Sequence, residues 1–421
     1  MKFEKPKLFP SVKVFTWVMV FLWLFIALRI LFKYDAYQEF KAKPFYFTEA
    51  KVLNSYEKSK KNRRYQVLKL KSKEGLTFYT TTHQKESMAD HILRLKVIPG
   101  ASLYFKDYLG TFYIQSRISS KTVQPKNYRD TLVEKIVSQH KEKSLQSFYS
   151  AIFFATPLDK ALREKISLLG VSHLVALSGF HLGILWGVVY GLLLFIYNPL
   201  QQKFFPYRYA LLDVGFVAIA FLGFYVWFVD YPPSLLRSYA MVLVGWIVLL
   251  MGIELLSFTF LFTILTLLIL LFPSLVVSLS FWLSIAGVAY IFLLLQYTKS
   301  YSKLSITFFV IPLGIFLFMQ PIVHAVFAVT SCYQLLSPLL SLLFVPFYPL
   351  AMLLHLLGFG MLFDTALGWL FALPEGSIHK LLPLWMLAFY IALSLGAIWS
   401  KKVFYLLLGI ATLYGVYLFY M

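Results

Sequence analysis

The stretch Leu168–Tyr197 constrains the fold of this chain more than any other segment. Its sequence, LLGVSHLVALSGFHLGILWGVVYGLLLFIY, is long and apolar enough to cross a bilayer, which takes about 20 residues as a helix. Its first half nevertheless carries His173, Ser178 and His181. Polar and ionisable groups at membrane depth are costly, and they usually face a bundle interior or a wet cavity. The stretch therefore predicts a membrane-embedded helix with one polar section.

Glycines are interleaved with these polar residues and admit two interpretations. Gly170, Gly179 and Gly183 would let the helix open locally, where a cavity can hydrate the backbone. Alternatively, glycine recurs every fourth residue, at Gly179, Gly183, Gly187 and Gly191, as in a seam of small residues that packs helices together. We favour packing combined with a hydrated path, and packing alone stays open.

Composition extends the membrane assignment to most of the chain. Hydrophobic residues make up 59% of the 421 residues and the mean hydropathy is +0.72, as in polytopic membrane proteins. The net charge of +20 is concentrated, because the segment 33–147 holds 23 Lys/Arg and 11 Asp/Glu. Such an excess favours an anionic partner, nucleic acid or lipid headgroups, over a merely solubilising surface. Cys332 is the single cysteine, which excludes an intrachain disulfide and a cysteine metal cluster.

Residues 1–32 are predicted to form a cytoplasmic N-terminus and a first transmembrane helix over Val14–Phe32, with Arg29 able to snorkel outward. A signal peptide is the alternative, but the apolar core is too long and no small-x-small cleavage site follows before Lys33. Four lysines within Met1–Lys13 place the N-terminus inside by the positive-inside bias.

Residues 33–147 are predicted to form a basic, periplasmic all-β domain with a helical tail over Asp130–Ser147. Alternating hydrophobicity and turn residues indicate short strands, and about five such strands suggest a small closed barrel of the oligonucleotide-binding (OB) kind. The expected strands are Tyr46–Tyr56, Arg64–Leu70, Leu76–Thr82, Ile92–Ile98, Ser102–Tyr108 and Thr111–Ile118. Residues 148–170 are expected to be an amphipathic segment at the membrane interface.

Residues 171–421 are predicted to be a multi-helix membrane domain. The whole chain is thus expected to be a polytopic α-helical membrane protein of about ten transmembrane or re-entrant helices, with the β domain inserted after the first. Three prolines should break the segment 333–361, namely Pro338, Pro346 and Pro349. The expected spans are 171–197, 208–229, 234–252, 255–272, 274–297, 305–328, 333–361, 363–373, 381–399 and 403–420.

Several chemistries are excluded at the level of sequence. No Gly-Lys pair occurs, so the chain has no P-loop. The eight histidines form no close His/Asp cluster in sequence, so we expect no metal and no other cofactor. His173 and His181 are eight residues apart, which turns them about 80° from each other on a regular helix and disfavours joint ligation.

The motif His173-Leu-Val-Ala-Leu-Ser178-Gly179-Phe-His181-Leu-Gly183 resembles the signature of the ComEC-type competence proteins, inner-membrane channels that admit transforming DNA. Weaker similarities follow in the family's order and extend the resemblance over roughly residues 33–358. They lie in Pro233–Ser238, Pro273–Ser284 and Leu336–Pro346.

The chain departs from the family pattern in three places. Trp282 stands where the family usually has Gln, and Ser341 where it usually has Asn. Many members also carry a C-terminal domain of metallo-β-lactamase type, whereas this sequence ends in a hydrophobic helix at Met421. We therefore expect a short, channel-only form without nuclease activity.

The resemblance implies a wet path for a polyanion and residues that line it. The expected lining residues are His173, Ser178, Gly179, His181, Gly183 and Arg237, whose guanidinium pairs well with phosphate. Snorkelling, or pairing with Asp230, is the alternative for Arg237. Polar residues of later helices are weaker candidates, with helix–helix hydrogen bonding as their usual role: Gln320, His324, Gln334 and Ser337.

In the predicted barrel, basic residues should contact phosphates and aromatic residues should stack on bases. The expected DNA-binding residues are Lys60, Lys61, Arg63, Arg64, Tyr65, Lys69 and Lys71. Further stacking candidates are Phe78, Tyr79, Tyr104 and Phe112, for which a place in the core is the alternative.

The sequence-level hypothesis is a bacterial inner-membrane channel that imports single-stranded transforming DNA during natural competence, and not an enzyme. Its expected partners are single-stranded DNA, the lipid bilayer, a periplasmic DNA receptor, a separate nuclease and a cytosolic motor or DNA-binding protein. A solute permease is the alternative. An intramembrane serine protease, with Ser178 as nucleophile and His324 or His355 as base, is a remote one.

Overall fold

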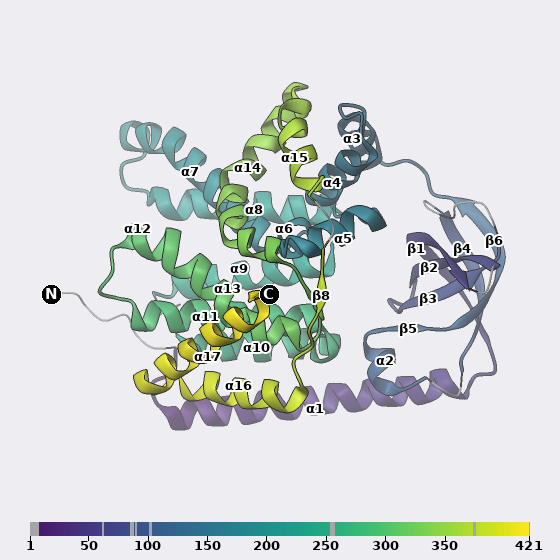
Figure 1. Ribbon diagram of the computed structural model, residues 1–421, viewed down its shortest axis with the longest axis horizontal. Helices are drawn as coiled ribbons and strands as arrows, with labels where there is room; N and C mark the ends of the chain where they lie inside the picture. Colours follow the sequence, from purple (N-terminus) through teal and green to yellow (C-terminus); the bar gives the residue numbers. More distant parts are fainter. Residues whose placement is uncertain are drawn as a thin grey trace. The chain divides into compact units, whose positions relative to one another are not determined.

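The computed structural model describes residues 8–60, 63–84, 88, 91–100, 103–252, 257–373 and 376–420, except the side chains of Lys60 and Arg63. The chain divides into two compact units. The β unit consists of Lys7–Asn127 and Phe262–Leu279, and the helical unit consists of Tyr128–Leu261 and Ser280–Met421. Figure 1 labels the elements of both units.

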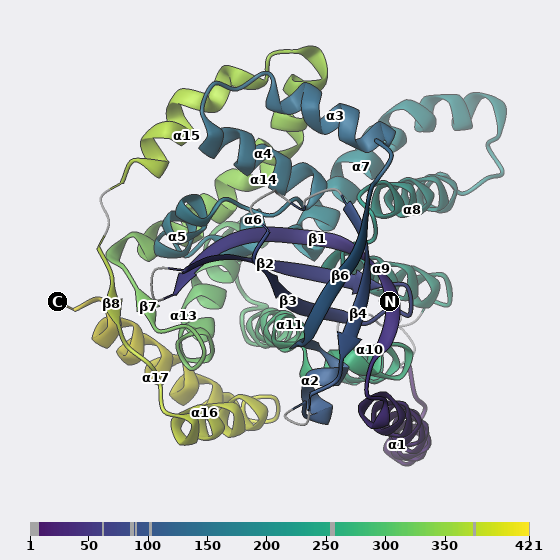
Figure 2. The ribbon, with the colours of Figure 1, turned by 90° about the vertical axis from the view of Figure 1, so that its right-hand side faces the viewer.

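A six-stranded sheet forms the centre of the β unit, with the strand order β5-β3-β2-β1-β4-β6. Its longest strand, β1, pairs with β4 through residues 46–51 and with β2 through residues 50–60. A bulge in β1 between Val52 and Asn54 bends the strand just after the part that pairs with β4 (Figure 2). The strands are β1 (Tyr46–Lys60), β2 (Arg63–Ser72), β3 (Thr77–Thr82), β4 (His91–Ile98), β5 (Thr111–Tyr113) and β6 (Gln115–Val123).

The last two strands bring the two edges of the sheet together. β5 pairs with β3 in parallel, and after Ile114 the chain continues as β6, which pairs with β4 in the antiparallel sense. A hydrogen bond of 2.8 Å between the hydroxyls of Thr80 and Ser116 links β3 to β6. The core of the sheet is mainly apolar, although four polar residues of its strands are also buried, namely Thr48, Gln66, Ser72 and Thr80. The apolar members without exposed surface are Leu68, Leu70, Phe78, Leu93, Leu95 and Val97.

Helix α1 (Val12–Ala42) is longer than the predicted span Val14–Phe32. Its additional turns carry Tyr37 and Phe40, which are buried in the core of the sheet. The Tyr37 hydroxyl also donates a hydrogen bond of 2.6 Å to the carbonyl of Leu103. Burial of these two aromatic rings stabilises the helix beyond the apolar span, which hydropathy alone does not reveal.

Arg29 of α1 makes hydrogen bonds to another helix. Its guanidinium donates hydrogen bonds to the carbonyls of Leu270 and Leu271, the last two residues of α10 (Phe258–Leu271). These carbonyls have no partner inside their own helix, and a cation is favourable at the negative end of the helix dipole. Arg29 therefore joins α1 to α10.

The strand predicted over 102–108 is wrong in its described part, because Phe105–Leu109 forms the short helix α2. Phe105 and Tyr108 are spaced three residues apart, and both pack against the core beside Tyr37. A helical turn brings both rings to that core, whereas a strand would direct them to opposite faces.

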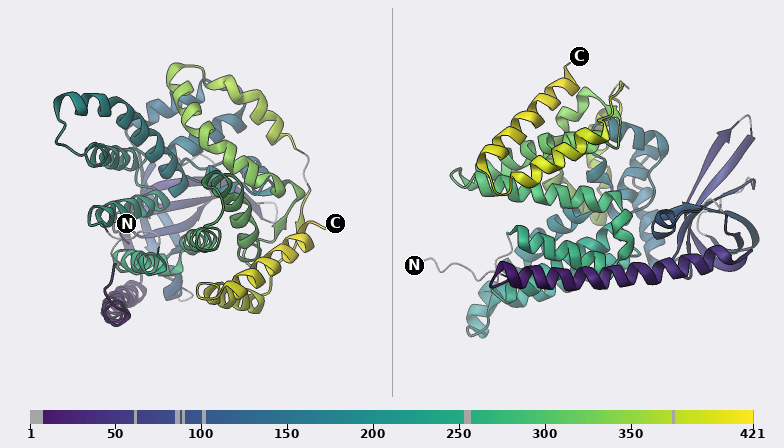
Figure 3. Two further views of the ribbon diagram at one scale, coloured as in Figure 1. Left: turned by 90° about the vertical axis from the view of Figure 1, so that its left-hand side faces the viewer. Right: turned by 90° about the horizontal axis from the view of Figure 1, so that it is seen from below.

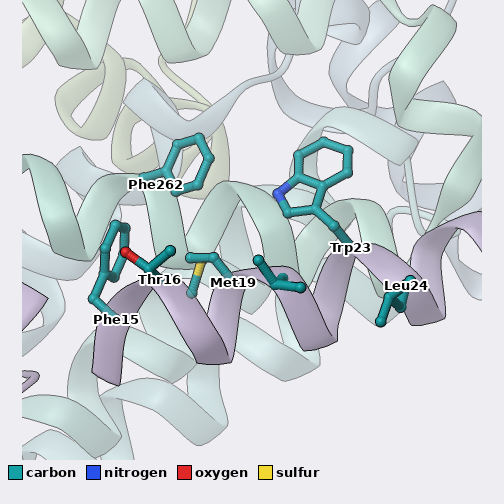
Figure 4. A pocket seen from close by; sticks show the side chains of 7 residues that line it. Phe15, Thr16, Met19, Trp23, Leu24 and Phe262 are labelled. Carbon is teal, nitrogen blue, oxygen red and sulfur yellow. The ribbon is translucent and has the colours of Figure 1, made fainter. Parts of the chain in front are cut away.

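The membrane-spanning part of α1 contributes to an apolar groove of about 490 Å³ with Phe262 of α10 (Figure 4). Its lining is Phe15, Thr16, Met19, Val20, Trp23, Leu24 and Phe262. Walls of this kind suit hydrocarbon and disfavour a charged ligand.

The helical unit is built from helices with short connections, among which α16 and α17 lie side by side (Figure 3). Its α-helices are α3 (Tyr128–Val137), α4 (Lys143–Phe154), α5 (Lys160–Leu168), α6 (Ser172–Val175), α7 (Gly179–Phe204), α8 (Ala210–Phe228), α9 (Pro233–Leu250), α11 (Leu279–Tyr297), α12 (Lys303–Ser305), α13 (Ile311–His324), α14 (Ser337–Leu357), α15 (Asp364–Phe371), α16 (Leu384–Gly396) and α17 (Lys401–Phe419). The remaining elements of the chain are η1 (Pro273–Val277), η2 (Ile306–Val310), η3 (Cys332–Leu336), η4 (Gly360–Phe363), β7 (Val329–Thr330) and β8 (Ile378–His379).

Eight helices of the described residues are long and apolar enough to cross a membrane, and three shorter apolar helices accompany them. The protein is a multi-pass membrane protein. The predicted break of 333–361 is confirmed at Pro338, where η3 ends and α14 begins, and is wrong at Pro346 and Pro349. Pro338 lies in the first turn of α14, which then continues uninterrupted through Pro346 and Pro349. Membrane helices tolerate such prolines because neighbouring groups satisfy the freed carbonyls.

Helices α8 and α9 approach each other at Gly215. A Cβ atom at this position would lie 2.0 Å from the Trp246 ring of α9, so only glycine fits. Gly245, the neighbour of Trp246 in sequence, faces open space and offers a matched control.

We expect Gly215→Ala to lower the free energy of unfolding by about 1–3 kcal/mol, because the added methyl overpacks the contact. Gly245→Ala should leave stability unchanged or raise it by up to about 1 kcal/mol, the helix propensity difference. Thermal unfolding of both variants in the same detergent measures the difference. Equal stability of the two variants would contradict the close approach of α8 and α9.

Candidate functional site

The predicted polar helix is interrupted, as the glycine pattern indicated. Helix α6 ends at Val175, residues 176–178 are not helical, and α7 begins at Gly179. Gly170, before α6, has a φ of +68° and a Cβ there would lie 3.1 Å from the Gln334 side chain. Glycine alone combines that conformation with this close contact. We call residues 176–178 the helix break.

Serine hydroxyls from two other helices satisfy the backbone around the helix break. Ser234 of α9 donates a hydrogen bond of 2.6 Å to the carbonyl of Leu177. Ser337 of α14 donates one of 3.3 Å to the carbonyl of Gly170. Ser341, one turn further along α14, lies 3.4 Å from Nε2 of His173. Because non-helical backbone in a membrane protein needs such partners, Ser234 and Ser337 stabilise the interruption.

Ser178 and His181 form the start of α7. The backbone N–H of Ser178 donates to Nδ1 of His181 at 3.3 Å, and the Ser178 hydroxyl lies at the same distance from Nδ1. An accepting Nδ1 places the proton of a neutral ring on Nε2. His181 has no exposed surface, and its Nε2 is buried without a hydrogen-bond partner among the described residues. A buried donor of this kind is costly and marks a position where an acceptor would bind favourably.

Two aromatic rings of α14 enclose His181. The ring centres of Phe344 and Tyr348 lie 5.2 and 4.8 Å from the imidazole, both in edge-to-face geometry. The Tyr348 hydroxyl lies 3.1 Å from that of Tyr225 on α8. His181 is therefore sealed in the interface of α7 and α14, whereas His173 is exposed and Ser178 partly buried.

The glycines of α7 differ from one another. A Cβ at Gly179 would lie 2.7 Å from the hydroxyl of Ser238, so α7 and α9 are in close contact there. A Cβ at Gly183, Gly187 or Gly191 would meet no described atom within 4 Å. Within the described residues, only Gly179 of the glycine repeat packs closely against another helix, so the repeat does not form a packing seam.

Arg237 of α9 is partly buried and donates a hydrogen bond of 3.0 Å to the hydroxyl of Ser280 on α11. Among the weaker candidates, Gln334 and Ser337 contact the segment before the break through Gly170. Gln320 and His324 are hydrogen-bonded within α13, through the Gln320 carbonyl and Nδ1 of His324 at 3.0 Å.

The histidines considered as protease bases have other hydrogen-bond partners. Nε2 of His324 lies 2.9 Å from the Thr330 hydroxyl, and Nε2 of His355 lies 2.8 Å from Nε2 of His140. The histidine that contacts Ser178 is His181, and this contact belongs to the start of α7. These contacts do not support the serine protease hypothesis.

A cavity of about 290 Å³ opens beside the helix break. Ala176 and Leu177 of the break and Ser234 of α9 line it, together with Arg163 of α5. A further lining residue, Thr156, has a buried hydroxyl without a hydrogen-bond partner among the described residues. The break therefore borders a space with polar groups in its wall.

In the β unit, the predicted DNA-binding residues are only partly described. Lys61 and the side chains of Lys60 and Arg63 lie outside the described residues. Arg64 and Lys71 are exposed, whereas Tyr65 and Lys69 are partly buried. The ammonium of Lys69 lies 5.9 Å from the centre of the Tyr79 ring. Two of the stacking candidates, Phe78 and Phe112, belong to the core, and Tyr104 is exposed.

Pairing of the strands reveals basic and aromatic residues that sequence analysis missed. Lys96 of β4 is directly opposite Phe47 of β1 on one side and Arg117 of β6 on the other. The Lys96 ammonium lies 3.8 Å from the centre of the Phe45 ring. Phe45 and Phe47 are exposed, and we call Phe45, Phe47, Lys96 and Arg117 the basic–aromatic surface.

Lys51 of β1 and Lys71 of β2 are directly opposite each other and form a second pair of like charges. Lys51 lies on the same face of β1 as Phe47, because the two residues are four positions apart on the strand. Like charges in directly opposed positions destabilise a sheet. Lys96 and Arg117 would therefore be stabilised by an anion. Their detection requires the strand register, which the sequence pattern alone does not define.

These features define a class: a multi-pass membrane protein with an interrupted polar helix and a basic β unit. The chain belongs to the Competence protein family, whose model matches residues 155–420. The resemblance seen in the sequence is confirmed. An uncharacterized protein of Aquifex aeolicus (strain VF5) is 27% identical over 221 residues, which are 52% of this chain and 49% of that protein. The match thus spans about half the length of this curated relative. No solved structure matches the chain.

We expect Gly179→Ala to destabilise the protein by about 1–3 kcal/mol, since the methyl overpacks the contact with Ser238. Gly183→Ala, four residues along the same helix, is the control and should be neutral or slightly stabilising. Thermal unfolding in detergent compares the two. Adding Ser238→Ala to Gly179→Ala should restore part of the lost stability. Equal stability of Gly179→Ala and Gly183→Ala would contradict the close contact between α7 and α9.

Proposed function

We propose that this protein is a membrane channel for DNA uptake, and that a single strand passes the helix break on its way into the bacterial cytoplasm. One observation carries the proposal. Four segments with similarity to the competence signature meet in the fold, because α9 and α14 contact the break and its flanks, and Arg237 of α9 contacts Ser280 of α11. A shared site explains why they occur together in one chain.

The chemistry of this site suits a polyanion. Ser178, Ser234, Ser238, Ser337 and Ser341 make this wall small and polar without a fixed charge. Four of their hydroxyls donate to backbone carbonyls, namely those of Leu177, Ser234, Gly170 and Ser337, so a phosphate oxygen would have to replace one of these acceptors. Arg237 adds a permanently charged, forked donor. A permanent cluster of cations would retain the strand, whereas a mainly neutral wall with one cation lets it move.

Passage beyond the break requires a change in the interface of α7 and α14. His181 is enclosed by Phe344 and Tyr348, so a strand that reaches it must displace these rings. The unpartnered Nε2–H would then gain a phosphate oxygen as acceptor. Loss of aromatic packing and gain of a charge-assisted hydrogen bond offset each other, as a gate that opens to DNA requires.

The β unit supports the DNA assignment as a strand-binding module. Its strands follow one another in the order β1-β2-β3, then β5 and β6 as one interrupted strand, then β4 back to β1. This order supports the proposal of an OB-like barrel. The basic–aromatic surface combines cations with exposed rings, the usual means of holding a single strand.

Import of DNA through this channel would require partner proteins. A negative-inside membrane potential opposes entry of a polyanion, and the sequence contains no P-loop. A cytosolic motor or a DNA-binding protein would supply the force, and a periplasmic receptor and a separate nuclease would supply the strand. The channel would lie in the inner membrane with its N-terminus in the cytoplasm.

Uptake of fluorescent DNA in a strain lacking this chain tests the proposal. We expect labelled DNA to accumulate outside the inner membrane and to reach the cytoplasm again when the chain is restored. Normal internalisation in the deletion strain would contradict the proposed function.

We expect Lys96→Gln with Arg117→Gln to weaken binding of single-stranded DNA by the full chain and to flatten its salt dependence. Loss of two phosphate contacts should lower the slope of log K against log salt by about 1.4, at about 0.7 per contact. Lys160→Gln on α5 is the control, because this exposed lysine pairs with Glu164 outside the β unit. Fluorescence anisotropy at several salt concentrations measures the slope. If the double variant has the same slope as the control, the basic–aromatic surface does not bind the DNA.

A further inference from the structure

Three titratable residues that are remote in sequence meet inside the helical unit. His140 lies between α3 and α4, His355 near the end of α14, and Asp364 at the start of α15. Nδ1 of His140 lies 2.9 Å from both carboxylate oxygens of Asp364, and its Nε2 lies 2.8 Å from Nε2 of His355. This group, here called the His–His–Asp chain, has no part in the proposed DNA path.

The surroundings of the His–His–Asp chain are buried and make several contacts with it. His140 and His355 are 4% and 2% exposed. The Tyr149 ring of α4 stacks on His140 with 4.4 Å between ring centres and contacts His355 at the same distance. The amide of Gln139 donates to the His355 carbonyl, and its oxygen accepts from the backbone N–H of Gly360.

Counting donors determines how many protons the two rings hold. Nδ1 of His355 lies 2.6 Å from the carbonyl of Ala351, and a carbonyl only accepts, so this nitrogen carries a proton. An ionised Asp364 carboxylate also only accepts, and with this carboxylate as partner Nδ1 of His140 carries a proton as well. Between the two Nε2 atoms one must donate. The rings thus share three N–H protons, one more than two neutral imidazoles possess.

We propose that His140, His355 and Asp364 form a buried proton-binding site that joins the segment between α3 and α4 to α14 and α15. The bound proton lies between the two Nε2 atoms, and the Asp364 carboxylate balances its charge. This carboxylate is the least buried member, with a side chain 21% exposed, and it offers the route by which the proton exchanges with solvent.

A metal ion does not explain the geometry. Two nitrogens on one zinc ion lie about 2.0 Å from the metal and well over 2.8 Å from each other. The described residues contain no group of three or more potential ligands that could hold a metal ion. Tyr149 remains a neutral phenol, because burial, and next the charge of Asp364, raise its pKa above the usual value.

With this number of protons, either gain or loss of a proton weakens the contact between the two histidines. A further proton would place two N–H groups opposite each other, and removal of the bound proton would leave two lone pairs opposite each other. Either change replaces an attractive contact with a repulsive one in a buried position, where such contacts are costly. The singly protonated state is therefore the one that holds the elements together.

Nuclear magnetic resonance of the full chain, labelled with ¹⁵N-histidine in detergent at neutral pH, tests this site without DNA. We expect one coupling between two imidazole nitrogens across a hydrogen bond, together with an imidazolium signature. Asp364→Asn keeps the shape, and its amide can donate to Nδ1 of His140, but it removes the balancing charge. In that variant the imidazolium signature should be lost.

His379→Gln is the control, because the exposed His379 of β8 lies outside the chain of hydrogen bonds, and this variant should retain both signals. Two neutral histidines in the unmodified protein, or an imidazolium that survives Asp364→Asn, would overturn the proposal. Since the measurement uses no DNA, its outcome is independent of whether the protein imports a strand.

Discussion

Hydrogen bonds from serine hydroxyls to carbonyls at the helix break and its flank are the interactions on which the rest of the helical unit depends. An interrupted membrane helix exposes carbonyl groups that its own backbone no longer satisfies, and each unsatisfied group in hydrocarbon costs several kcal/mol. Ser234 and Ser337 bind the carbonyls of Leu177 and Gly170. They position α9 and α14 against the break, and the serine side chains that stabilise the interruption also make it polar.

The interface of α7 and α14 adds a second constraint. His181 is oriented by Ser178 and enclosed by two aromatic rings. The polar residues of the break are therefore followed along α7 by a buried, tightly packed imidazole. A polar entrance followed by an aromatic closure separates two tasks. In the proposed channel, the entrance would accommodate a charged polymer, and the closure would prevent leakage of small ions while no polymer is present.

Much of this organisation could be predicted from the sequence, because it rests on local signals. Apolar length identified most of the membrane helices, and His173, Ser178 and the glycines identified the interruption. Strand alternation located β1 to β4, but it merged β5 and β6 into one strand over Thr111–Ile118. It also misassigned Phe105–Leu109, where two rings three residues apart required a helix.

The remainder depends on contacts between residues that are remote in sequence. No local signal indicates that Ser341 lies beside His173, or that Lys96 is opposite Arg117. The pairing of His140 with His355, 215 residues further along the chain, likewise has no local signal, because the eight histidines form no cluster in the sequence. The extension of α1 past Phe32 arises from burial of Tyr37 in a core that only the folded sheet provides.

Crosslinking of DNA in transit tests most directly whether the strand passes the helix break. The single, exposed Cys332 is first replaced by Ser, and a photoreactive group is then attached to a cysteine introduced at Ser178 or, as a control, at Phe195, which is 80% exposed on α7. Our account predicts that imported DNA crosslinks to position 178 and not to position 195. Uptake that continues with crosslinks at neither position, or equally at both, would contradict it.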